Sequence, residues 1–109
     1  MAWLLRDGDV LASLDLARSW RERSRGLLGR DGIDGALWIA PARQVHTVGL
    51  RFAIDVAFCD GDGVVLRIVT LPRHRVALPV LKARAVVEAE AGSFGRWNLK
   101  VGDQLEVKE

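Results

Sequence analysis

The chain has 109 residues, of which 50% are hydrophobic and 28% are charged, and this balance is typical of one globular domain spanning residues 1–109. Its apolar runs are short and interrupted by Arg or Asp, which excludes a membrane-spanning segment, and residues 1–9 contain no apolar core for a signal peptide. A cytoplasmic protein is therefore expected, and the single cysteine, Cys59, excludes an internal disulfide framework and a cysteine-based zinc cluster.

The net charge of +2 comes from arginine, because the chain has 13 Arg and only three Lys residues. Five arginines lie close together between residues 18 and 30, and Arg73, His74 and Arg75 form a second basic cluster. Such clusters can bind phosphates, but a solvated helix face and a polar loop are the favoured interpretations. Aromatic residues are not interleaved with the basic ones, so a nucleic-acid partner is not expected.

The first predicted elements are a strand, a short helix and a second strand. Apolar residues alternate over Val10–Leu16 as in a half-buried strand. Ser19 and Glu22 have the spacing of a capping box at the start of a helix, which nearby glycines limit to about two or three turns. Leu37–Ala40 is expected to form a strand that ends at Pro41.

The central part of the chain predicts two further strands and a hairpin. Gln44–Val48 and Ala53–Cys59 have strand patterns, and the Asp60–Gly63 turn separates the second of these from Val64–Val69. Gly63 can take the left-handed position of a type I turn with a G1 bulge. We expect the core face of the hairpin to consist of even-numbered residues, namely Ile54, Val56, Phe58, Leu66 and Ile68.

The last third of the chain predicts two more strands. Ala85–Ala91 is expected to be a strand with Glu88 and Glu90 on one side, followed by a short helical or turn segment over Gly92–Leu99 and a closing strand over Gln104–Lys108. Seven to eight short strands and one short helix predict a mainly β fold. We expect a small antiparallel β-sandwich or barrel with one short α-helix.

Several of these motifs, in this order, resemble a known family. They are Arg25–Arg30, His46–Phe58, Asp60–Gly63, Val87–Gly92 and Gly102–Asp103. The chain resembles the bacterial and archaeal family called domain of unknown function number 192, in the branch that has His-Thr where other members have a Trp-Met-Lys-Asn type of segment. The resemblance implies a compact, mainly antiparallel β fold, and it implies no established biochemical activity.

The stretch Val45–Phe58 is the part of the chain most suggestive of a site. It places His46, Arg51 and Asp55 in an apolar, strand-like setting, where an ionised side chain is costly unless it is paired or used. For Asp55, an ion pair with Arg67 or Arg51 is the favoured interpretation, and a general base or metal ligand is the alternative.

A metal site is not expected around His46, and no cofactor is implied by the sequence. A metal-binding histidine needs at least two more donors, and the chain has neither a His-x-His nor a Cys-x-x-Cys motif. His46, Asp55 and Glu88 could form such a site only if three separate strands brought them together. A histidine in the core or at its rim is therefore favoured.

Two classes of function fit these residues. The favoured class is a binding module for a small anionic ligand or a protein partner, in which Arg25, Arg43 and Arg51 flank a mouth near His46. The alternative is a hydrolytic or metal-assisted enzyme that uses Asp55 and His46. The binding module is favoured because no nucleophile or complete metal-ligand set accompanies these two residues. We predict that any ligand site includes at least one of His46, Arg51 and Asp55, with Arg25 or Arg43 adding positive charge.

Overall fold

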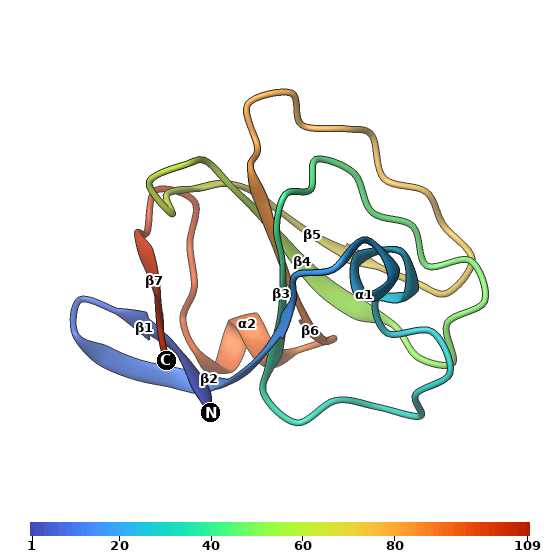
Figure 1. Ribbon diagram of the computed structural model, residues 1–109, viewed down its shortest axis with the longest axis horizontal. Coiled ribbons are helices and arrows are strands. Elements are labelled where there is room, and N and C mark those ends of the chain that lie inside the picture. The colour runs from blue at the N-terminus through green and yellow to red at the C-terminus, as the bar shows by residue number, and fades with distance from the viewer.

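The computed structural model describes residues 1–109, which form one seven-stranded sheet and two short helices (Figure 1). In chain order the elements are β1 (Ala2–Arg6), β2 (Asp9–Ala17), α1 (Trp20–Arg25), β3 (Ala36–Ile39), β4 (Ile54–Cys59), β5 (Val65–Leu71), β6 (Ala85–Glu90), α2 (Ser93–Arg96) and β7 (Leu105–Lys108). The strands lie in the order β5-β4-β6-β3-β2-β1-β7. Neither helix is long and apolar enough to cross a membrane.

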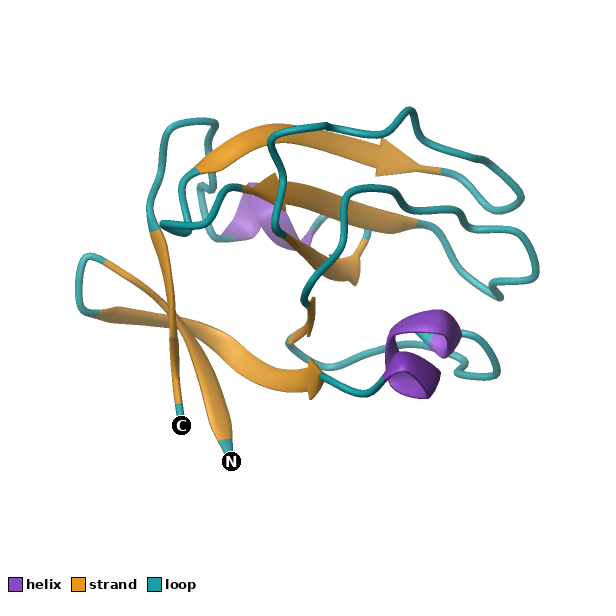
Figure 2. Ribbon diagram, turned by 45° about the horizontal axis from the view of Figure 1, so that its top comes forward, coloured by secondary structure: helices purple, strands orange, loops and turns teal.

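The sheet curls into a half-barrel because its two edge strands meet at one end (Figures 1 and 2). Val64 and Gln104 form an isolated bridge there, and the Val65 N–H donates a 2.8 Å hydrogen bond to the Asp103 carbonyl. Gly63 lies at this junction with a φ of +84°, and a Cβ atom at this position would clash with the carbonyl oxygen of Leu105. A mainly β fold of seven strands is therefore confirmed.

One strand pair differs from the antiparallel arrangement expected from the sequence. Strands β2 and β3 are parallel, whereas all the other pairs are antiparallel. Two parallel strands need a long crossover connection, and α1 with the segment up to residue 35 provides it.

One strand of the sheet was missed in the sequence, and one expected strand is absent from it. Strand β1 was not expected, but it is hydrogen-bonded to β2 on one side and to β7 on the other. Gln44–Val48 is not a regular strand of the sheet and forms only the bridge between His46 and Val76. Its alternation of buried Val45 and Thr47 with exposed neighbours arises because it packs as a loop against the segment 72–80.

The hairpin between β4 and β5 is confirmed, including its turn. The Gly63 N–H donates to the Asp60 carbonyl at 3.1 Å, and the Asp60 carboxylate accepts hydrogen bonds from the N–H groups of Asp62 and Val64 at 2.9 Å each. This geometry matches a tight turn closed by a left-handed glycine.

The predicted core face of this hairpin was wrong for β5. The pairing shifts by one residue between Phe58 and Cys59, so Val69 lies opposite Val56, and Ile68 lies opposite Ala57. A shift of one residue moves every later side chain to the other face of the sheet. The opposite face of β4 is also buried, because the sheet carries a core on each side.

The two cores differ in what covers the sheet. The inner core takes residues from all seven strands and is closed by Phe94 of α2 and the following Leu99. The outer core lies under Leu27, Val45 and Leu50 from the segments that follow α1 and β3. Figure 1 shows α1 and the loops of residues 40–53 and 72–84 gathered on one side of the sheet.

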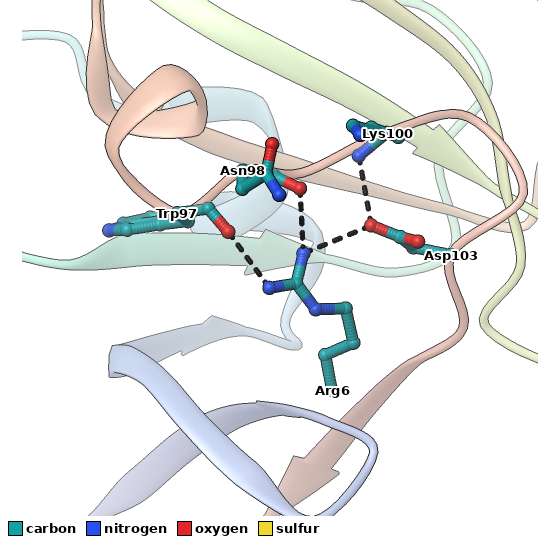
Figure 3. A network of polar contacts seen from close by, with 5 residues as sticks. All are labelled: Arg6, Trp97, Asn98, Lys100 and Asp103. Atoms are coloured by element: carbon teal, nitrogen blue, oxygen red, sulfur yellow. Dashed lines mark hydrogen bonds and ion pairs between the residues drawn. The ribbon is translucent and has the colours of Figure 1, made fainter.

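A polar network fixes β1 to the loop before β7 (Figure 3). The guanidinium of Arg6 donates to the carbonyl oxygens of Trp97 and Asn98 at 2.9 Å each and forms a 3.0 Å ion pair with Asp103. Asp103 also accepts a hydrogen bond from the Lys100 N–H at 2.9 Å. This backbone hydrogen bond, with the Arg6 contact, lowers the pKa of Asp103 below its usual range.

Candidate functional site

A cavity of about 550 Å³ lies on the outer side of the sheet. Its walls come from α1 and the residues just after it, from the segment 41–46, from residues 83 and 84, and from β6. The polar side chains that line it include Arg23, Arg25, Arg43, His46, Arg84 and Glu88. The volume is in the range of sites that bind small molecules.

Helix α1 forms one wall, and its own sequence determines where it begins and ends. Ser19 caps the first turn: its hydroxyl accepts from the Glu22 N–H at 3.0 Å, and the Glu22 carboxylate accepts from the Ser19 N–H at 2.9 Å. The predicted capping box is thus confirmed. The helix ends at Gly26, where φ is +51°, and the chain there passes over Glu88, whose Oε1 would be 3.8 Å from a Cβ at Gly26.

Glu88 is the acidic residue of the cavity. It lies on β6 between Leu37 of β3 and Val56 of β4, and its relative exposure is 5%. The structure contains no hydrogen bond or ion pair of its carboxyl group, although none of the protein's fully buried side-chain polar atoms lacks a partner. The Glu88 oxygens therefore keep some exposed surface, and the surface that Glu88 lines is that of the cavity. Burial raises the pKa of Glu88 to about 7.

The four arginines of the cavity have no acidic partner. The ion pairs of the protein are formed by other arginines, whereas Arg23, Arg25, Arg43 and Arg84 take part in none. Arg84 donates only to backbone carbonyl oxygens, at 3.0 Å in the case of Ala83. Arg23 and Arg25 also donate to backbone carbonyl oxygens, those of Arg18 and Leu28, each at 3.4 Å. Arg25, Arg43 and Arg84 are exposed residues of the cavity lining, whereas Glu88 is buried on the sheet.

His46 is an exposed residue of the segment 41–46. It lines the cavity and also a shallower groove with Val48 and Val76. It is thus a rim histidine, as favoured from the sequence. No group of three or more His, Cys, Asp or Glu side chains is placed to hold a metal ion.

Asp55 lies on the other face of the sheet, away from this cavity. Its Oδ2 accepts hydrogen bonds from the N–H groups of Gly92 and Phe94 at 3.0 Å each, and its Oδ1 accepts from the Thr70 hydroxyl at 2.7 Å. The predicted ion pair with Arg67 or Arg51 is therefore wrong. The carboxylate instead caps the first turn of α2 from a neighbouring strand, where a negative charge is favourable.

Arg51 also lies outside the cavity. It is exposed and forms a 2.8 Å ion pair with Asp31. The expected mouth flanked by Arg25, Arg43 and Arg51 is thus corrected, because Arg51 is not among the lining residues.

Comparison with known proteins places this fold in a family. The family called domain of unknown function 192, described as "Uncharacterized ACR", matches residues 3–107. The chain belongs to this family. The resemblance seen in the sequence motifs is confirmed, and with it membership of a family that has no characterised activity.

One sequence relative and two solved structures are similar to this family member. A UPF0127 protein of Pyrococcus abyssi (strain GE5 / Orsay) is 26% identical over 98 residues, which cover 85% of this chain and 84% of the relative. A solved protein of unknown function from Novosphingobium aromaticivorans DSM 12444 has a TM-score of 0.81 and 22% identity, and the match covers 96% of this chain and 82% of that one. A Sinorhizobium meliloti 1021 protein, described as a "putative transcription regulator", has a TM-score of 0.81 and 20% identity, with 97% and 91% covered.

The structure of this family member brings together three of the five candidate residues. Arg25, Arg43 and His46 line the cavity, whereas Arg51 and Asp55 do not. The alternative of an enzyme that uses Asp55 together with His46 is incompatible with this geometry, because the two side chains are on opposite faces of the sheet.

Three charged residues of the cavity lining were not among the candidates, namely Arg23, Arg84 and Glu88. The sequence suggests a role for Glu88 only as a metal ligand together with His46 and Asp55. The signal that could have identified it is a single acidic residue inside the apolar run Ala85–Ala89, because a continuous apolar run is typical of a strand covered on both faces. The two arginines carry no comparable signal in the sequence.

Proposed function

We propose that this protein is a binding module that takes a small anionic ligand into the cavity on the outer face of the sheet. The observation that carries the proposal is the convergence of four arginines without acidic partners on one concave surface. Guanidinium groups bind carboxylates and phosphates through paired, charge-assisted hydrogen bonds.

The charge balance of the cavity supports an anion. Four permanent positive charges face one carboxyl group, and that group holds a proton for much of the time near neutral pH because its pKa is about 7. A cleft with charges of one sign and poorly polarisable walls concentrates the electric field and attracts ions of the opposite sign.

The shape of the site favours a small ligand over a protein partner. The arginines surround a concave space of about 550 Å³ that has one apolar wall, formed by Leu27, Ile39, Val45 and Leu50. Small-molecule sites are mainly apolar hollows with a few convergent polar groups, whereas stable protein interfaces are broader.

Chemical-shift mapping on ¹⁵N-labelled protein tests the proposal, with inorganic phosphate, 4-methylpentanoate and 2-hydroxy-4-methylpentanoate as probes. We expect at least one probe to shift the backbone signals of Gly26, Val45 and His46. The double variant Arg25→Gln/Arg43→Gln should weaken its binding at least tenfold, because it removes two charge-assisted contacts.

Arg21→Gln is the matched control for this experiment. Arg21 lies on α1 as an exposed arginine but does not line the cavity, so its replacement should change the dissociation constant less than twofold. If the shifts cluster instead at Arg73–Arg75, or if the control weakens binding as much as the double variant, the ligand is held elsewhere and the proposal is wrong.

A further inference from the structure

Glu88 is a feature that anion binding alone does not explain. A simple anion offers no hydrogen-bond donor to the oxygens of Glu88, and burying a carboxyl group without a partner costs free energy. Yet Glu88 is 5% exposed, has no partner within the protein and lines the same cavity as the arginines. A buried polar group of this kind usually has a hydrogen-bond partner, which in an open cavity is water or a ligand.

We infer that the ligand is a 2-hydroxy- or 2-amino-carboxylate with an aliphatic side chain, and that Glu88 accepts a hydrogen bond from its hydroxyl or ammonium group. This inference rests on the proposed function and names the class of molecule that the cavity takes. A hydroxyl and an ammonium group share the chemistry that the site requires, which is a donor beside a carboxylate.

The arrangement of charge in the cavity matches such a molecule. Arg25, Arg43 and Arg84 are exposed residues of the cavity lining without acidic partners and can bind the carboxylate, while Glu88 is buried on the sheet. A ligand with a donor next to its carboxylate satisfies both groups. A carboxylate without a donor leaves an ionised Glu88 unpaired, and a phosphate dianion adds a second negative charge near it.

The apolar wall indicates what the rest of the ligand is. Leu27, Ile39, Val45 and Leu50 line the cavity and also belong to the outer core, so their positions are held by packing. They offer no hydrogen-bonding side chains, and an aliphatic group against them removes apolar surface from water.

Three acids with one carbon skeleton test the inference on the unmodified protein. They are 4-methylpentanoate, which has no donor, 2-hydroxy-4-methylpentanoate and leucine. Dissociation constants are measured by chemical-shift titration and calorimetry. We expect the hydroxy acid or the amino acid to bind at least tenfold more tightly than 4-methylpentanoate, and the tighter of the two identifies the donor.

The variant Glu88→Leu tests whether the Glu88 carboxyl group causes the preference for an acid with a donor over 4-methylpentanoate. Leucine is compatible with the neighbours Leu37 and Val56, and in the variant the three acids should bind within about fivefold of one another. Glu90→Leu is the control, because Glu90 is exposed on the same strand and does not line the cavity, so the preference should remain.

The outcomes separate the inference from the proposed function. If the three acids bind the unmodified protein within fivefold of one another at the cavity, or if the preference survives in Glu88→Leu, the inference is wrong while the anion site stands. If none of the acids and no phosphate perturbs the cavity, the proposed function fails, and the inference fails with it.

Discussion

Asp55 of β4 accepts hydrogen bonds from the start of α2, and its replacement by alanine should remove them and lower the stability of the protein. The carboxylate is 4% exposed and accepts two backbone hydrogen bonds from the start of α2, from Gly92 and Phe94, and one from the Thr70 hydroxyl. In Asp55→Ala the hydroxyl of the exposed Thr70 can turn to water. The N–H of the exposed Gly92 can also reach water, but the Phe94 N–H loses its acceptor where it is buried.

The magnitude follows from these contacts. A buried donor that loses its acceptor costs about 1–3 kcal/mol, and the lost acceptor here is charged and lies at a helix N-terminus. One buried donor, one partly buried donor and the lost charge at the helix N-terminus therefore predict a decrease of about 2–4 kcal/mol in the free energy of unfolding. A loss of this size is a large part of the stability of a small domain, which is about 5–15 kcal/mol.

Asp55→Asn is the matched control. The amide oxygen of asparagine can still accept from Gly92 and Phe94, so only the assistance of the charge is lost, and we expect a decrease of about 1–2 kcal/mol. An ion pair of Asp55 with an arginine would make the same substitution far more costly, because it would leave a buried positive charge unpaired.

Urea unfolding followed by tryptophan fluorescence measures both variants under the same conditions. Equal losses for Asp55→Ala and Asp55→Asn would refute the capping role, because that role depends on an acceptor oxygen that asparagine keeps. A loss below about 1 kcal/mol in Asp55→Ala would equally show that α2 does not depend on this contact.

Three further variants test the closure of the half-barrel and the burial of Glu88. Gly63→Ala should lower the free energy of unfolding by about 2–4 kcal/mol in denaturant melts, because its φ is +84° and a Cβ would meet the Leu105 carbonyl; a neutral result would mean that the edges do not meet there. Arg6→Gln should cost about 1–3 kcal/mol by losing hydrogen bonds to two carbonyl oxygens, and an unchanged midpoint in the same melts would contradict this. Burial raises the pKa of Glu88 from 4.5 to about 7, so the folded state binds the proton more tightly, and the stability of the unmodified protein relative to Glu88→Gln should fall by about 3 kcal/mol as the pH rises from about 4.5 to 7. Melts at several pH values that show a constant difference would contradict the burial of this carboxyl group.

The elements that the sequence predicts correctly depend on contacts between residues close together in the chain. The capping box of Ser19 and Glu22 and the turn over Asp60–Gly63 join groups only a few residues apart, so residue type and spacing are enough to predict them. The same holds for the alternation that predicts most of the strands, and for the motifs that indicate the family.

What the tertiary structure alone decides are the contacts between distant parts of the chain. The sequence marks Asp55 as a costly carboxylate to bury, but two of its three partners, 37 and 39 residues away, are backbone N–H groups, which carry no signature of residue type. The one-residue shift in the pairing of β4 with β5 likewise selects the faces of β5, and local alternation cannot predict such a shift.

The candidate site divides in the same way. The sequence by itself determines which residues are costly to bury and which are basic, and three of its five candidates line the cavity. Glu88 of β6 lies beneath Gly26, the residue after α1, and shares the cavity lining with arginines from three segments. This depends on how the crossover and the long loops pack over the sheet. The physical reason is that burial and pairing depend on the packing of the whole chain, whereas capping and turn preferences depend on a few neighbouring residues.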